Sequence, residues 1–479
     1  MLFNSMTFVI FALVVIPLFF VLPQKARPVF LLAASWYFYM SWNVAYIFLF
    51  LGATLLSYFS ARLIEDGFYR KAMLFVSIGI SFGALFLYKY FGFTMSVIAD
   101  FAGVFGLNLS VPEISLALPV GISFYTFQMV SYVFDVYRGK MRAQRNFVTY
   151  ALYLAFFVQL VAGPIERAEN LIPQFYEEHK FSLKRLERGM QRILWGYFKK
   201  MVVADRLSIF VDAVYQNPAA AGGTAGVVAT VFFAFQIYCD FSGYCDIAIG
   251  VADIMGFRLS KNFDRPYLSA SIGEFWDRWH ITLSSWLFDY IYIPLGGSRV
   301  GKIRYVVNVM IVFLASGIWH GAGWTFIVWG FIHGCLVAGQ KLMKKSGIRI
   351  IPQRIKDTFI CRWIFVILTF CVVTAAWVFF RAQNLTDAWT VLSGISDFSL
   401  SHITDGSLLK FGMGMPELVF AAVSAVFLFV CEAVGEKISF DRVFRGSSKY
   451  VVYTLLALIV MIFGVYGSNI VKQFIYFQF

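Results

Sequence analysis

Two histidines are the side chains best suited to move a proton in this largely apolar chain. His320 lies inside the stretch Tyr305–Gln340, which contains no Asp, Glu, Lys or Arg. An imidazole accepts or donates a proton near neutral pH, whereas a charged group at bilayer depth costs at least ~2.5 kcal/mol, so a functional role is the default. His280 precedes His320 by forty residues. We predict proton transfer at His320, with His280 bordering the same cavity.

The residues around His280 combine bulky aromatic and charged groups. The run Phe275-Trp276-Asp277-Arg278-Trp279-His280 lies within 261–304, a segment with several charges, several aromatics and two prolines. Such a segment cannot face lipid, so we expect it to be re-entrant or interfacial and to line a protected cavity. An alternative is plain interfacial anchoring, with tryptophans and an Arg–Asp pair at headgroup level.

Other ionisable groups carry less information. Asp240 and Asp246 are six residues apart, a spacing that does not place them on one helical face, and we expect Arg278 or Arg265 to pair with them. His333 is expected to be a neutral packing histidine bonded to the backbone. The six cysteines show no metal-ligand spacing, so no metal site is predicted.

The composition indicates a helical membrane protein that positions these groups. The chain is 60% hydrophobic and 14% charged, against about 25% charged in soluble domains. The long runs are apolar on all sides rather than alternating, which excludes barrel strands. We predict an all-α, polytopic protein with about eleven to thirteen membrane helices, whose first run is a retained span and not a signal peptide. Four runs lack Asp, Glu, Lys and Arg: Met1–Gln24, Pro28–Ala61, Ala213–Cys239 and Tyr450–Val471.

The net charge of +13 is explained by the membrane and not by nucleic acid. Basic residues gather in short loops, which mark the cytoplasmic side and meet anionic lipid there. The connection 384–417 has four acidic residues against one lysine, and we place it outside the cell membrane. The whole chain, 1–479, is predicted to be one transmembrane domain. The basic groups are Arg138 to Arg145, Lys180 to Arg192, and Lys341 to Lys356.

Several motifs, in this order, resemble the membrane-bound O-acyltransferase family, and within it the alginate O-acetyltransferase branch that acetylates exported polysaccharides in bacteria. The central match is the run from Phe275 to His280, continued through Thr282-Leu283-Ser284 and Asp289-Tyr290-Ile291-Tyr292-Ile293-Pro294-Leu295-Gly296-Gly297, and resumed at Gly317-Ile318-Trp319-His320-Gly321. Supporting matches are Leu118 to Phe124, Leu160 to Ile165, Asp240 to Tyr244 and Trp377 to Arg381. The resemblance covers nearly the whole chain. Asp277 and Phe288 depart from it, since basic residues are expected there in alginate-type relatives.

The resemblance implies a ring of tilted helices around a central funnel, with His320 as the catalytic base and His280 as the second catalytic position. It implies acyl transfer, of acetyl above all, from a cytoplasmic thioester such as acetyl-CoA to the hydroxyls of an extracytoplasmic polysaccharide, with no permanently bound cofactor. The chain lacks a GDS-type esterase nucleophile, so an SGNH-type esterase or other acyl-relay partner is expected outside a bacterial inner membrane. Candidates for donor contacts or channel lining are Trp276, Asp277, Arg278, Trp279, Trp319, Asp240 and Ser242.

Three alternatives remain open from the sequence. The nearest is D-alanyl transfer to teichoic acids within the same family, which uses a carrier-protein donor. A transporter, with His320 binding substrate or relaying protons, is disfavoured because no internal repeat is visible. The third is a scaffold of an export machine in which the histidines only pack.

Overall fold

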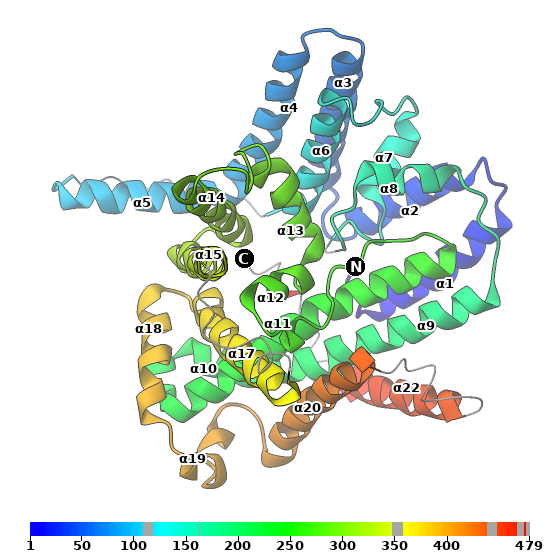
Figure 1. Cartoon of the computed structure of the whole chain (residues 1–479). Coiled ribbons are helices and arrows are strands. Elements are labelled where there is room, and N and C mark those ends of the chain that lie inside the picture. Colours follow the sequence, from blue (N-terminus) through cyan, green and yellow to red (C-terminus); the bar gives the residue numbers. More distant parts are fainter. Residues whose placement is uncertain are drawn as a thin grey trace. The chain divides into compact units, whose positions relative to one another are not determined.

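The described part of the chain is helical throughout. The structure, a computed structural model, describes residues 1–107, 109, 118–161, 163–346, 358–437, 448–466 and 474–475. Within these ranges there are helices and no strand (Figure 1). The predicted all-α class is therefore confirmed. The predicted basic residues Arg349, Arg354 and Lys356, and part of the last uncharged run, lie outside the described residues.

Seven helices in the described ranges are long and apolar enough to cross a membrane, which confirms a polytopic membrane protein. The number is lower than the predicted eleven to thirteen, because several apolar segments form helices shorter than the roughly 20 residues that a span needs. One of them, α6 (Ile122–Tyr137), has 16 residues, almost all buried by protein. The seven candidates are Tyr46–Glu65, Arg70–Val104, Pro218–Met255, Lys302–His320, Trp324–Lys344, Phe359–Arg381 and Met415–Gly435.

Contacts within the chain define two compact units, residues 1–190 with 248–260 and residues 191–247 with 261–479. In the first unit α3, α4 and α6 pack side by side, and α2 packs on α7 (Figure 1). Its elements are α1 (Met6–Val21), α2 (Arg27–Met40), α3 (Tyr46–Glu65), α4 (Arg70–Leu85), η1 (Phe86–Tyr90), α5 (Phe91–Val104), α6, α7 (Phe147–Ala155), α8 (Ala168–Leu171), η2 (Pro173–Tyr176), and the first part of α9 (Leu183–Tyr197).

The second unit holds both histidines of interest. It contains residues 218–247 of the longest helix, α11 (Pro218–Met255), and the remaining residues of that helix are assigned to the first unit. The other elements are the end of α9, η3 (Phe198–Ala204), α10 (Asp205–Gln216), η4 (Pro266–Leu268), α12 (Ile272–Arg278), α13 (Ile281–Leu287), η5 (Phe288–Tyr292), α14 (Lys302–His320), α15 (Trp324–Lys345), α17 (Phe359–Arg381), α18 (Leu385–Ser393), η6 (Gly394–Asp397), α19 (Ser401–Thr404), η7 (Ser407–Lys410), α20 (Met415–Lys437) and α22 (Ser448–Tyr466).

The two segments singled out in the sequence contain only short helices. Residues 261–304 form η4, α12, α13 and η5 before α14 begins, and none of these four is long enough to cross a bilayer. The connection 384–417 forms α18, η6, α19 and η7. A re-entrant or interfacial course for the first segment and an extracytoplasmic position for the second remain predictions.

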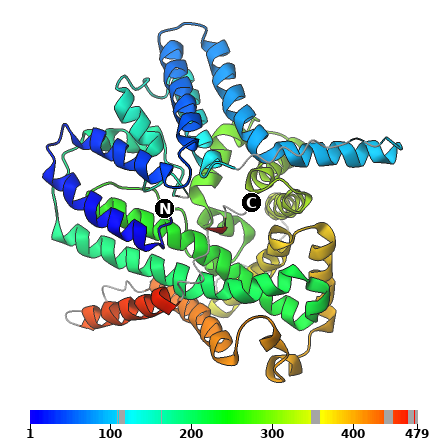
Figure 2. The ribbon, with the colours of Figure 1, turned by 180° about the vertical axis from the view of Figure 1, so that it is seen from behind.

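A close helix pair, α14 and α15, carries His320 at the end of its first member. Both views show the two helices side by side and nearly end-on (Figures 1 and 2). Glycines make this approach possible: a Cβ atom added to Gly317 would lie 2.3 Å from the carbonyl oxygen of Phe326, and one added to Gly330 would lie 2.4 Å from that of Phe313. Small residues allow such close backbone contact in membrane helices.

We expect the substitution Gly330→Val to destabilise the protein by about 1–3 kcal/mol, the usual cost of overpacking, because the two helices would have to separate. The measurement is the free energy of unfolding in mixed micelles. Gly339→Val on the same helix is the control, since a Cβ there meets nothing within 4 Å. Equal stability of the two variants would show that the glycine contact is not needed.

Candidate active site

His280 lies at a strained turn between α12 and α13. Its backbone has φ 44° and ψ 51°, in the left-handed region. Such a conformation in a non-glycine residue costs of order 1–3 kcal/mol and persists only where the surrounding structure fixes it. His280 is fully buried. The chain therefore holds this ring in place at an energetic cost, which supports a functional role.

A neighbouring amide fixes the tautomer of His280. Oδ1 of Asn262 accepts the Thr282 backbone N–H at 3.1 Å and the Thr282 hydroxyl at 2.9 Å, and it lies 3.2 Å from Nδ1 of His280. Since this oxygen can only accept, Nδ1 carries the proton and Nε2 presents its lone pair. Burial lowers the pKa of His280 to about 3, so the ring is neutral. Asn262 was not singled out in the sequence.

The structure brings His320 next to His280. Their ring centroids are 6.3 Å apart, and the indole of Trp319 lies 5.8 Å from His280. His320 is 2% exposed and is surrounded by aromatic rings, with centroid distances of 5.2 Å to both Trp329 and Phe380. The two imidazoles thus lie close together among buried aromatic rings, and the cavity that they were expected to border remains a prediction. The arrangement can place a proton acceptor beside a reacting hydroxyl.

A third histidine joins this aromatic core. His333 is fully buried, and its Nδ1 accepts a hydrogen bond from Nε1 of Trp276 at 3.3 Å. Trp329 lies between His333 and His320, with centroid distances of 5.0 and 5.2 Å. His333 packs in the core as expected, but it hydrogen-bonds to an indole and not to the backbone.

The two residues before His280, Arg278 and Trp279, lie in different environments. Trp279 is fully buried, with its ring 5.5 Å from that of Phe275 and 5.0 Å from that of Trp377. Arg278 forms an ion pair with Glu274, one turn earlier in α12, at 2.7 Å. Its pairing with Asp240 or Asp246 was predicted, and the structure gives those carboxylates other partners.

Asp240 and Asp246 are held by lysines of η3. Lys200 pairs with Asp240 and, at 2.9 Å, with Asp205. Lys199 lies 3.0 Å from Asp246, which also binds Arg192. Burial opposes charge on Lys200, but the two neighbouring carboxylates more than offset it and raise its pKa above the ordinary value. The π-helical turn of η3, a feature often found at functional sites, directs these two lysines to different partners.

Two residues near the C-terminal end, Phe474 and Ile475, contact the region around Asp240. The backbone N–H of Ile475 donates to Oδ2 of Asp240 at 2.7 Å. The neighbouring Phe474 packs on Phe241, whose ring lies 4.7 Å from His280. Ser242 is buried, and its hydroxyl has no hydrogen-bond partner within the described ranges.

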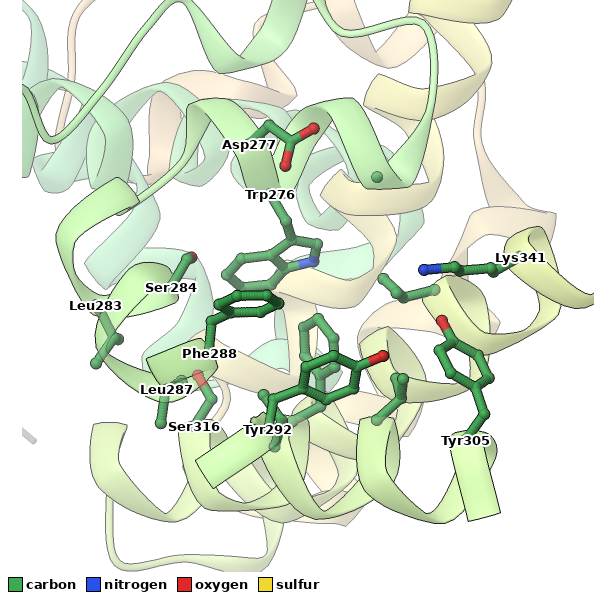
Figure 3. Close-up of a pocket in the computed structure, with 15 residues that line it drawn as sticks. Trp276, Asp277, Leu283, Ser284, Leu287, Phe288, Tyr292, Tyr305, Ser316 and Lys341 are labelled. Carbon is green, nitrogen blue, oxygen red and sulfur yellow. The ribbon is translucent and has the colours of Figure 1, made fainter. Parts of the chain in front are cut away.

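A pocket of about 300 Å³ lies beside the aromatic core (Figure 3). Trp276 and Asp277 come from α12, and their side chains lie across the cavity from Tyr292 and Tyr305 in the close-up. Both residues that depart from the alginate-type pattern, Asp277 and Phe288, line it. Neither His280 nor His320 does. The complete lining is Gly273, Trp276, Asp277, Leu283, Ser284, Leu287, Phe288, Tyr292, Tyr305, Val309, Val312, Phe313, Ser316, Val337 and Lys341.

The structure thus shows a helical membrane protein with two adjacent buried histidines, and comparison with known proteins gives its class. The sequence pattern of the membrane-bound O-acyltransferase family matches residues 139–380, which include both histidines. The chain belongs to this family, and it is an O-acyltransferase.

Curated relatives from several bacteria support this assignment. A protein of Pseudomonas putida named "Probable alginate O-acetylase AlgI" is 36% identical over 437 residues, covering 89% of this chain and 87% of the relative. A peptidoglycan O-acetyltransferase of Helicobacter pylori is 34% identical, covering 81% and 78%. A teichoic acid D-alanyltransferase of Streptococcus thermophilus is 26% identical and covers only 56% of this chain.

Proposed function

We propose that this enzyme transfers an acetyl group from a cytoplasmic thioester to the hydroxyl of a polysaccharide, or of a relay partner, on the other side of a bacterial inner membrane. Two of the relatives described above are named for O-acetyl transfer, one to alginate and one to peptidoglycan. The D-alanyl alternative has weaker support, since that relative is less similar and matches about half of the chain. Family membership favours an enzyme over a transporter or scaffold.

The proposed binding site for the thioester donor rests on the pocket described above. Lys341 and Tyr305 line one part of it, with the ammonium 5.2 Å from the Tyr305 ring centre. Ser316, further along α14, also lines it. At 1.5 Å rise per residue, Tyr305 and Ser316 are about 16 Å apart along the helix. The pocket thus extends from a basic side chain in a predicted cytoplasmic region to within one helical turn of His320.

These features suit a phosphopantetheine thioester. Its phosphate would meet the positive charge of Lys341, and its apolar arm would lie against the aromatic walls. CoA and carrier-protein donors both present the acyl group on a phosphopantetheine arm, so the pocket is compatible with either donor.

His320 is proposed to act as general base in the transfer. The acceptor hydroxyl gives its proton to His320 while its oxygen forms a bond to the thioester carbonyl carbon. The C–S bond then breaks, and the departing thiolate takes the proton back from His320, so the histidine is regenerated. His280 Nε2, which is an acceptor because Nδ1 holds the proton toward Asn262, is suited to accept a hydrogen bond from a second hydroxyl of the polysaccharide and so to orient it.

A test of the donor site is the substitution Lys341→Gln. We expect the KM for acetyl-CoA to rise by up to about tenfold, with kcat little changed, because this charge attracts the donor without touching the reacting atoms. The effect should shrink as salt is added. Lys344→Gln, an exposed lysine outside the pocket lining, is the control. The same KM for Lys341→Gln and wild type would contradict the donor pocket.

The acceptor-side partner is proposed to be an SGNH-type or other acyl-relay protein that contacts the connection 384–417. This connection exposes large apolar side chains, with Trp389 69% and Leu400 72% exposed, together with its acidic residues. A reconstituted chain that acetylates glycan efficiently by itself would contradict the need for such a partner.

A further inference from the structure

Two indoles, those of Trp276 and Trp329, lie between the proposed donor pocket and His320. Trp276 lines the pocket, and its ring centroid lies 5.8 Å from that of Trp329. Trp329 does not line the pocket, and its ring lies 5.2 Å from His320. An acyl group carried along the pocket therefore meets Trp276 before it reaches the histidine.

We propose that Trp276, held in place by His333, limits the length of the acyl group that this enzyme accepts. This inference rests on the proposed function, since it assigns a specificity role within the proposed donor pocket. Trp276 is the specificity-determining residue, and His333 is a positioning residue that acts through it.

His333 gives the indole a fixed orientation. The indole N–H donates to Nδ1 of His333 at 3.3 Å, so the histidine proton lies on Nε2. The His333 ring cannot readily shift, because it is fully buried with Trp329 at 5.0 Å and Phe313 at 6.4 Å. Phe313 also packs on Trp276 at 5.1 Å and lines the pocket. The Trp276 indole, which forms one wall of the pocket, is thus held in place by a hydrogen bond to α15 and by packing against α14 and α15.

A fixed wall discriminates between chain lengths. An acetyl group presents one methyl to the indole, whereas each added methylene must displace a side chain in a close-packed core. Discrimination of about 10–200-fold for one methylene is the range that such pockets reach. The arrangement therefore favours acetyl over longer acyl groups.

The experiment compares kcat/KM for acetyl-CoA and butyryl-CoA in proteoliposomes. We expect Trp276→Ala to raise the butyryl-to-acetyl ratio at least about tenfold, and Trp276→Leu to change it in the same direction while leaving less empty space. His333→Leu should also raise the ratio, because the indole loses its acceptor. His333→Gln, which retains an acceptor oxygen, should stay close to wild type. Phe48→Ala, at an exposed aromatic residue of α3 outside the pocket lining, should leave the ratio unchanged.

Three negative results are distinguishable. An unchanged ratio in active Trp276→Ala and Trp276→Leu would overturn the length limit and leave the proposed function intact. A ratio that rises equally in His333→Leu and His333→Gln would overturn the positioning role of His333. If the wild type transferred no acyl group from any CoA thioester, both this inference and the proposed CoA donor would fall.

Discussion

Replacing His320 with alanine is expected to lower the rate of acyl transfer by 10²–10⁴, the usual contribution of a positioned general base. The loss should fall on kcat, with little change in the KM for the donor, because His320 does not line the pocket proposed to hold the thioester. The assay is acetyl transfer at matched amounts of folded protein.

A matched control separates catalysis from packing. His402 is an exposed histidine of α19, and His402→Ala should retain the wild-type rate when no partner protein is present in the assay. Because His320 is surrounded by rings, His320→Ala also leaves a cavity, so its unfolding free energy is measured in parallel. Full activity of a folded His320→Ala variant would remove His320 from the mechanism.

The second large effect is expected from Lys200→Met, which should destabilise the protein by about 3–5 kcal/mol. Lys200 is 6% exposed and pairs with both Asp205 and Asp240. Removing its charge leaves two buried carboxylates without their shared cation. Little water is available there to stabilise their negative charges. The measurement is the denaturant dependence of unfolding in mixed micelles.

A double-variant cycle tests the reason for this loss. Lys200→Met combined with Asp240→Asn should be less damaging than the sum of the single changes, because one uncompensated charge is removed with its partner. Lys261→Met breaks the exposed pair with Asp264, 2.7 Å apart, and should cost less than about 1 kcal/mol. Strictly additive effects of Lys200→Met and Asp240→Asn would contradict coupling through this pair.

The central features of the site could be predicted because they are local in the sequence. An uncharged stretch around His320 and a mixed aromatic and charged run before His280 predicted that the two histidines lie near each other, and their rings are 6.3 Å apart. The cavity that they were expected to border remains a prediction. The all-α class followed in the same way from long apolar runs. Their roles in catalysis remain predictions, since the structure shows their proximity and not their action.

The partners of buried charges could not be predicted from local patterns. Lys200 and Asp240 are forty residues apart, and Lys199 and Asp246 forty-seven, so only the packing of η3 against α11 brings them together. The prediction of Arg278 as a partner was wrong because a carboxylate one turn away, Glu274, binds it within its own helix. A buried lysine pair following an amphipathic basic helix was the signal that could have pointed to these contacts.

The role of Trp276 also depends on distant contacts. Its type suggested an interfacial or channel-lining position, and it does line a pocket. Its hydrogen bond to His333, fifty-seven residues later, results from α12 packing on α15. The described residues contain seven helices long and apolar enough to cross a membrane, fewer than the expected number of spans, because a sequence shows that a segment is apolar but not how long its helix is.

The most direct test of the central claim is a one-sided transfer assay in proteoliposomes of known orientation. Labelled acetyl-CoA is supplied only to the face that carries Lys341, and label is measured on the protein, a partner or a glycan at the opposite face, for wild type and His320→Ala. The account predicts labelling across the membrane by wild type and at least a hundredfold less by the variant. Equal labelling by the two proteins would contradict an acyl transfer that depends on His320.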